Sequence, residues 1–148
     1  MLGQVNAVGK RRCPWAAVAL VAVIITAACG SSEPAAQGTA VKVVESDFEI
    51  KVQTNVTAGD VVLMVHNQGP DDHELIVVPA PVGELPMRGS GLTVAEESFK
   101  PEPLGVLEPG APGSDRRLQL HLQPGRYVLF CNMSGHYLGG MHETLVAS

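Results

Sequence analysis

A series of short apolar segments with alternating polarity runs from residue 41 to the C-terminus and limits the possible folds. The clearest is 116–122 (RRLQLHL), in which every second residue from Leu118 onward is leucine. A period of two places these leucines on one face of a β-strand. Gly, Pro, Asn and Asp separate the segments, and such residues mark turns. The pattern therefore predicts an all-β domain.

Seven segments are predicted as strands. They are residues 41–46, 48–53, 61–67, 73–79, 116–122, 127–131 and 143–148. The nearly continuous apolar run 61–67 is typical of a central strand. In 48–53, alternation predicts that Phe48, Ile50 and Val52 face inward. About seven to eight short strands with regular turns predict an antiparallel β-sandwich with Greek-key connections.

Residues 80–115 form a long excursion within this pattern. The excursion contains six prolines and several glycines, so we expect most of it to be irregular. Thr93 and Glu96 have the spacing of a capping box, which predicts one or two helical turns over 93–99. A connection of this length is typical of a crossover or of a functional cover.

The N-terminus resembles the signal peptide of a bacterial lipoprotein. Residues 10–12 are basic and 15–28 are apolar, a run too short to span a bilayer comfortably. The apolar run ends at Thr26-Ala27-Ala28-Cys29, which is similar to a lipobox except for Thr26 in place of the usual leucine. We expect residues 1–28 to be removed and Cys29 to be lipidated. Ordinary signal cleavage and an uncleaved anchor are the alternatives.

The expected mature protein is a small acidic domain on a tether. Residues 29–40 are predicted to be a flexible linker, and 41–148 to be the folded domain. Removal of 1–28 leaves 7 Lys and Arg against 15 Asp and Glu, a formal net charge of −8. This charge argues against nucleic acid as a partner and favours either a cationic partner or plain solubility. The predicted location is outside the cytoplasm, at the outer face of the cell membrane, in the periplasm or at the cell surface.

The cysteines point to a metal. Cys13 leaves with the signal segment and Cys29 would carry lipid, so Cys131 is a lone thiol in an oxidising compartment. A metal-bound thiolate explains such a residue, and a buried inert cysteine is the alternative.

The residues around Cys131 form the pattern C-x4-H-x4-M, with His136 and Met141 at five-residue intervals. Thiolate, imidazole and thioether donors together select copper, particularly Cu(I). The pattern lies between two predicted strands, and Gly135, Gly139 and Gly140 allow the backbone to turn around an ion.

A mononuclear site needs a further strong donor, and His73 is the best candidate because it stands where a loop enters a strand. Met141 is then predicted to be a weak axial ligand. The remaining histidines are expected at the surface. His66 and His121 lie on the outward phase of their strands, and the pleat turns His142 away from Met141.

The segments 67–78 (NQGPDDHELIVV) and 131–148 (CNMSGHYLGGMHETLVAS) together resemble a cupredoxin, a type 1 blue copper protein, over about 41–148. The spacing of the ligand loop is similar to that of rusticyanin, auracyanin and sulfocyanin. The resemblance implies a Greek-key sandwich that binds one copper, with trigonal ligation by His73, Cys131 and His136 and axial Met141. Asn67 matches the asparagine that opens the first ligand loop. Residues 80–115 depart from the compact core of the family, and Glu74 is acidic where some members have asparagine.

The function predicted is one-electron transport, with no enzymatic activity. We expect His136 to reach the surface within a small apolar patch that includes Tyr137 and Leu138, although these two side chains could instead pack under the loop. Backbone N–H groups of Asn132 and Met133 are the expected donors to the Cys131 sulfur.

The domain is expected to be a monomer that docks on a redox protein such as a c-type cytochrome or an oxidase subunit, with Asp71 and Asp72 steering a basic partner. A copper-delivery lipoprotein is the alternative function. A multicopper enzyme is a weaker one, because the spare histidines are separated in sequence.

Overall fold

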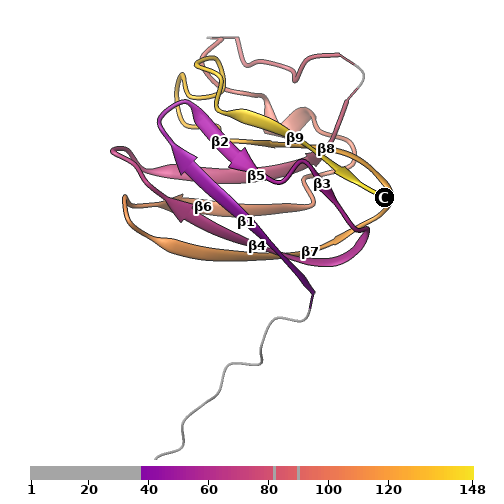
Figure 1. Ribbon diagram of the computed structural model, residues 1–148. Helices are drawn as coiled ribbons and strands as arrows, with labels where there is room; N and C mark the ends of the chain where they lie inside the picture. The colour runs from indigo at the N-terminus through magenta and orange to yellow at the C-terminus, as the bar shows by residue number, and fades with distance from the viewer. Residues whose placement is uncertain (1–37, 82, 90) are drawn as a thin grey trace, which may run out of the picture. The chain divides into compact units, whose positions relative to one another are not determined.

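The computed structural model describes residues 38–81, 83–89 and 91–148 (Figure 1). The expected signal segment 1–28, Cys29 and most of the expected tether lie outside the described residues. All described residues belong to one compact unit, 34–148. Within the described ranges, no helix has the length and apolar character needed to cross a bilayer.

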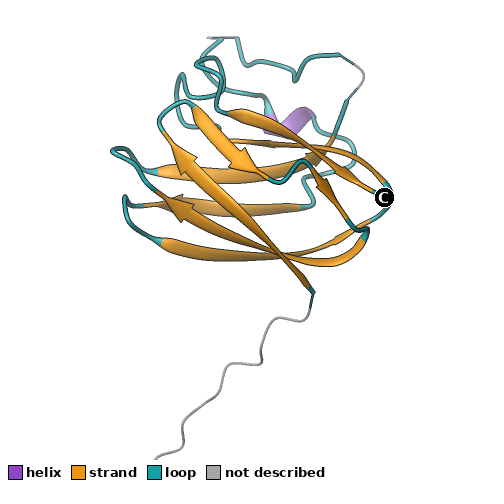
Figure 2. Ribbon diagram, viewed as in Figure 1, coloured by secondary structure: helices purple, strands orange, loops and turns teal. Residues whose placement is uncertain are grey.

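Strands dominate the described residues, with a single short 3-10 helix (Figure 2). The elements are β1 (Thr39–Ser46), β2 (Glu49–Val52), β3 (Asn55–Val56), β4 (Gly59–Asn67), β5 (His73–Pro79), η1 (Glu96–Ser98), β6 (Gly105–Gly110), β7 (Asp115–Leu122), β8 (Gly125–Phe130) and β9 (His142–Ala147). One sheet has the order β2-β1-β4-β7 and the other β3-β9-β8-β5-β6. The predicted all-β sandwich is confirmed.

The sheets are mixed rather than purely antiparallel. β1 pairs with β4 in parallel, and β3 pairs with β9 in parallel, while the remaining pairs are antiparallel. Two strands, β3 and β6, fall outside the predicted segments. β3 has only two residues, and β6 contains Pro109, which is tolerated because β6 lies at a sheet edge. Neither segment has the alternation that identified the other strands.

The main core lies between the sheets and contains residues from both. Leu120 and Leu122 are buried as predicted, and β4 is central in its sheet. The prediction for Phe48 is wrong, since its side chain is 50% exposed and it lies in the turn after β1. Ile50 is buried, so it rather than Phe48 is the first inward-facing residue of this segment.

The excursion covers the outer face of the five-stranded sheet. Its residues Leu85 and Val94 pack with Ile76, Val78 and Phe130 in a second buried cluster. The predicted helix is reduced to the three residues of η1, and Ala95 rather than Thr93 precedes it without a side-chain cap. The excursion thus gives the sandwich a third layer of irregular chain.

Candidate metal centre

Connections from distant parts of the sequence meet at one end of the sandwich. These are the β1–β2 turn, the β4–β5 loop at 68–72 and the β8–β9 loop at 131–141, which lie near one another in Figure 1. A hydrogen bond joins the first two, from the backbone N–H of Asp71 to Oδ1 of Asp47, at 3.4 Å. The predicted ligands lie on the second and third of these connections or at their ends.

Asn67 organises the loop that leads to His73. Its buried amide donates to the carbonyl oxygens of Asp71 at 2.9 Å and Gly110 at 2.8 Å, and its Oδ1 accepts from the N–H of Gly69 at 2.6 Å. These bonds tie both ends of the 68–72 loop to the end of β6. His73 is thereby fixed as the first residue of β5, with its side chain fully buried.

The β8–β9 loop is closed by hydrogen bonds between the predicted ligands themselves. The N–H of Cys131 donates to the carbonyl of Met141 at 3.1 Å, and the N–H of Met141 donates to the carbonyl of His136 at 3.0 Å. Gly140 adopts a φ of 105°, a conformation that favours glycine. The loop is thus a compact turn that presents three donor residues inward.

Three of the predicted ligands converge. Nδ1 of His73 lies 3.2 Å from Nδ1 of His136, and Sγ of Cys131 lies 3.5 Å from the same nitrogen of His136. One donor atom from each residue falls within 4.8 Å of the other two. His73 and Cys131 are fully buried, whereas His136 is partly exposed.

No protein-family model matches the chain, and no curated protein matches it by sequence. Solved structures do match its fold. Auracyanin from Roseiflexus castenholzii matches with a TM-score of 0.57 over 75% of this chain and 98% of its own, at 15% identity. Auracyanin A, a blue copper protein from Chloroflexus aurantiacus, gives 0.56 over 76% and 100%, at 14% identity. Rusticyanin from Thiobacillus ferrooxidans gives 0.54 over 76% and 79%, at 14% identity.

The domain has the cupredoxin fold. The resemblance read from the two ligand segments is therefore confirmed at the level of the fold. The cluster of His73, Cys131 and His136 lies at the end of this cupredoxin fold where the β4–β5 and β8–β9 connections meet, and it could hold one copper ion.

The electrostatics around the cluster of His73, Cys131 and His136 suit a soft cation. Burial lowers the pKa of His73 below its usual value, and the neighbouring His136 lowers it further, against the opposing charges of Asp47 and Asp71. A neutral imidazole keeps a lone pair for a metal. The donor set of two imidazoles and a thiol is the one that favours copper among the first-row metals.

Burial raises the pKa of the Cys131 thiol to about 11, although two backbone N–H groups oppose the shift. These donors belong to Met133 and Glu74. The prediction for Met133 is thus confirmed, whereas Glu74 takes the place expected for Asn132. Since a metal binds the thiolate, a bound cation would displace the thiol proton.

Glu74 and Asn132 brace the loop by other means. The carboxylate of Glu74 accepts a hydrogen bond from the backbone N–H of Asn132, while burial and the nearby Glu96 raise the pKa of Glu74. The side chain of Asn132 pairs with both backbone groups of Val94, at 2.6 and 3.1 Å. The acidic residue that departs from the family pattern therefore supports the cysteine loop, and Asn132 attaches the excursion to it.

Met141 is fully buried and belongs to the same hydrophobic cluster as Cys131. Its backbone is hydrogen-bonded to the two other predicted ligands of the loop, Cys131 and His136. A thioether there is suited to be a weak fourth donor, which stays a prediction.

The remaining histidines lie apart from the cluster, as predicted. His121 is exposed and lies 2.7 Å from Asp60, and His66 is partly exposed and lies 2.9 Å from Asp115. His142 is exposed, with its ring 4.9 Å from that of Tyr137.

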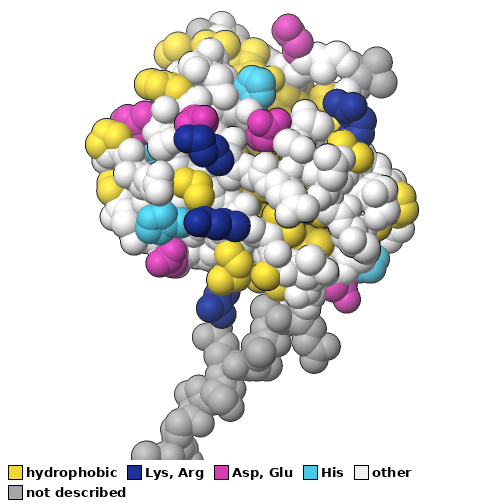
Figure 3. Space-filling model, viewed as in Figure 1, with side chains coloured by type: hydrophobic (Ala, Val, Ile, Leu, Met, Phe, Trp, Pro, Cys, Tyr) yellow, Lys and Arg dark blue, Asp and Glu magenta, His cyan; other side chains and the backbone are white. Residues whose placement is uncertain are grey.

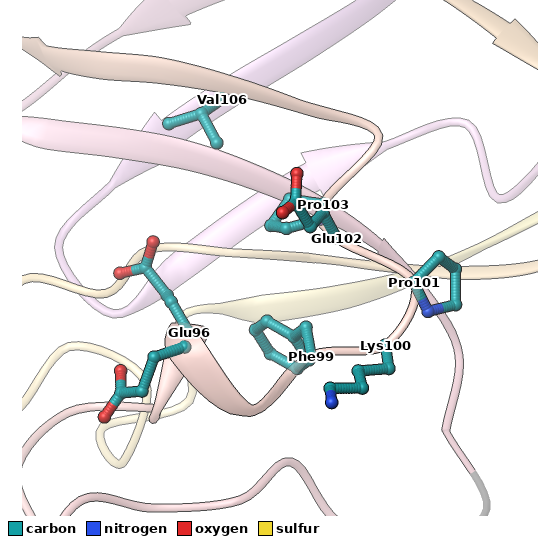
Figure 4. Close-up of a pocket in the computed structure, with 8 residues that line it drawn as sticks. Glu96, Phe99, Lys100, Pro101, Glu102, Pro103 and Val106 are labelled. Carbon is teal, nitrogen blue, oxygen red and sulfur yellow. The ribbon is translucent and has the colours of Figure 1, made fainter.

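A surface hollow of about 600 Å³ is separate from the cluster. It is formed mainly by the excursion, with Phe99 between Glu96 and Lys100 in Figure 4. None of the three clustered donors lines it.

Proposed function

We propose that this protein is a type 1 copper electron carrier, which cycles one copper between Cu(I) and Cu(II) outside the cytoplasm. The observation that carries the proposal is the convergence of two imidazole nitrogens and one sulfur from two distant segments of a cupredoxin fold. His73, Cys131 and His136 would be the strong ligands, and Met141 the weak axial ligand.

Bound copper would supply a one-electron couple, and the role of the chain is to hold the donors in one arrangement for both oxidation states. His73 is fixed at the start of β5 by the loop that Asn67 organises. Cys131 follows β8 directly, and its sulfur accepts from two backbone N–H groups. Ligands fixed by a β-scaffold have little room to relax, which favours rapid electron transfer over chemistry at the metal.

Burial supports a carrier over the alternative functions. Two of the three clustered donors, His73 and Cys131, have no exposed surface, which favours a retained ion over one that is handed to another protein. With Met141 as fourth donor, no coordination position remains for a substrate. His66 and His121 lie beside carboxylates elsewhere on the surface, which argues against a second copper and against enzymatic activity.

Electrons would leave through His136, the clustered donor that reaches the surface. Leu138 is 59% exposed in the same loop, whereas Tyr137 packs its ring against Phe130 at 5.8 Å. Figure 3 shows hydrophobic side chains gathered over this end of the domain. A small apolar patch suits the brief, weak docking of a redox encounter.

The proposed partner is a basic redox protein, such as a c-type cytochrome or an oxidase subunit. Asp71 and Asp72 are exposed in the loop before His73, where they can steer a positively charged surface toward the patch. A single domain with one site suffices for this role, so we expect a monomer.

The proposed location is the outer face of the cell membrane, with lipid on Cys29. The support is the sequence of residues 1–29 alone. Cys29→Ala should release the protein from the membrane fraction. Continued attachment of this variant would contradict lipidation.

The test of the copper site is the visible and EPR spectrum of the copper-loaded protein. The wild type should show an intense thiolate-to-copper band, and Cys131→Ser should lack it. His121→Ala, at an exposed histidine that pairs with Asp60 outside the cluster, is the matched control and should keep the band. A Cys131→Ser variant that keeps the band would refute the site.

Met141→Gln tests the axial position. This variant should retain copper with a shifted reduction potential.

A further inference from the structure

The turn between β1 and β2 touches both histidines of the site, although it lies outside the two segments that carry the ligands. The hairpin register leaves only Asp47 and Phe48 in this turn. Asp47 faces His73, and Phe48 faces His136.

The contact of Asp47 is on the side of His73 away from the cluster. Oδ1 of Asp47 lies 3.2 Å from Nε2 of His73, while Nδ1 of His73 faces His136. The two groups are not aligned as a full hydrogen bond, and no other group in the described part of the chain pairs with this nitrogen. Because a buried N–H without a partner is costly, the carboxylate favours the tautomer with the proton on Nε2. Nδ1 then keeps the lone pair that a metal requires.

Asp47 is itself held in place, since its Oδ1 also accepts a hydrogen bond from the backbone N–H of Asp71. The carboxylate is therefore tied to the loop that leads into His73. Its side chain is 28% exposed and lies against a fully buried ring.

Phe48 adopts a φ of 62°, which is rare and strained for an aromatic residue. Its ring packs edge-on against His136, with 5.5 Å between centroids. It also lies against Gly139, where an added Cβ would clash with the ring of Phe48. Since half of Phe48 remains exposed, burial alone does not account for the strained conformation. The conformation places the ring against the outer side of the ligand loop.

We propose that the Asp47–Phe48 turn is a positioning element of the metal centre. Asp47 sets the tautomer and orientation of His73, and Phe48 fixes the ring of His136. A carboxylate behind a ligating histidine raises the basicity of that ligand and fixes its ring. The inference rests on the proposed copper function, but its first test uses the apoprotein.

The first test is the tautomer of His73 in the ¹⁵N-labelled apoprotein, read from long-range ¹H–¹⁵N NMR spectra. The wild type should carry the proton on Nε2, and Asp47→Ala should populate both tautomers. Asp47→Asn keeps an acceptor oxygen and should restore the wild-type tautomer. Asp72→Ala removes a nearby exposed charge and is the matched control, with wild-type spectra expected. Unchanged His73 nitrogen shifts in Asp47→Ala would overturn the role of Asp47.

Phe48→Gly tests the second half of the inference, because glycine accepts the positive φ and the turn should still form. In the apoprotein, the His136 ring should populate more than one orientation and its signals should broaden. Ring signals as narrow as those of the wild type would overturn the role of Phe48.

The copper-loaded protein provides a second readout. Asp47→Ala should weaken copper affinity about 10-fold or more and raise the reduction potential, since His73 becomes a poorer donor to the oxidised ion. Asp47→Asn should lie between Asp47→Ala and the wild type. An unchanged affinity and potential in Asp47→Ala would contradict the proposal. Absence of copper binding by the wild type would instead refute the proposed function, while the NMR measurements still decide the role of the turn.

Discussion

A buried carboxylate, Glu45, makes the stability of the domain depend on pH. Glu45, on β1, has no exposed surface and pairs with Arg116 on β7. Burial raises the pKa of Glu45 to about 7, against the opposing effect of Arg116. Among the described residues, its second carboxylate oxygen and the Nε of Arg116 find no hydrogen-bond partner, so the pair is incompletely satisfied. Such a pair contributes less to stability than its short contact implies.

The raised pKa of Glu45 predicts that the domain loses stability as the pH rises. Between the unfolded value of 4.5 and the folded value of about 7, the folded state binds more protons than the unfolded state. The free energy of unfolding should therefore fall by about 3 kcal/mol in total from pH 4.5 to above pH 7. Urea unfolding of a Cys131→Ser background at pH 5 and pH 8 measures this change without metal.

Glu45→Gln in the same background should remove most of that pH dependence. Glu49→Gln, at an exposed carboxylate on β2, is the matched control and should retain it. A Cys131→Ser protein that is equally stable at both pH values, or more stable at pH 8, would contradict the raised pKa of Glu45.

At the scale of elements, the excursion is joined to the ligand loop through Asn132. This side chain satisfies both backbone groups of Val94, which is fully buried, and also donates to Glu96 at 2.6 Å. A further bond runs from the N–H of Gly135 to the carbonyl of Leu92 at 2.9 Å. The excursion therefore supports the residues that follow Cys131, in addition to covering the sheet.

Asn132→Ala should detach this cover. Two buried backbone groups would lose their partners, at a cost of about 2 kcal/mol in the free energy of unfolding. Hydrogen exchange of residues around 85–99 should rise, while exchange in β4 and β8 stays slow. Asn55→Ala, at an exposed asparagine, is the control and should change stability by less than about 0.5 kcal/mol. Hydrogen exchange in Asn132→Ala that is unchanged from the wild type would contradict this role.

At the scale of the whole molecule, the site joins connections from both sheets. The β1–β2 turn belongs to the four-stranded sheet, and the loop after β8 belongs to the five-stranded sheet. An ion held by His73, Cys131 and His136 would cross-link the start of β5 to the loop between β8 and β9. Metal binding and global folding should therefore be coupled.

Copper should raise the thermal stability of the domain by mass action. A free ion at 1,000 times its Kd adds about 4 kcal/mol to the free energy of unfolding. Calorimetry with and without Cu(I) should show a higher Tm for the wild type and for His121→Ala. Cys131→Ser should show little or no increase. An equal increase in Cys131→Ser would place the bound copper elsewhere.

The β class and the candidate residues of the cluster could be predicted from local sequence, because both are expressed at short range. Alternation identifies the inward face of Leu120 and Leu122 from neighbouring residues alone. The C-x4-H-x4-M pattern places its donors on one short loop whatever the rest of the chain does. His73 was identified by its place between a loop and a strand, and the structure brings it to the other two donors.

The surroundings of those donors could not be predicted in this way, because they come from distant parts of the chain. The contacts of Asp47 with His73, of Phe48 with His136 and of Asn132 with Val94 join residues at least 26 positions apart. The parallel pairing of β1 with β4 is equally invisible to local pattern. Periodicity and propensity report which face of an element is apolar, but they do not report which distant element packs there. That choice depends on how the two sheets bury their faces together, and it is made only when the whole chain folds.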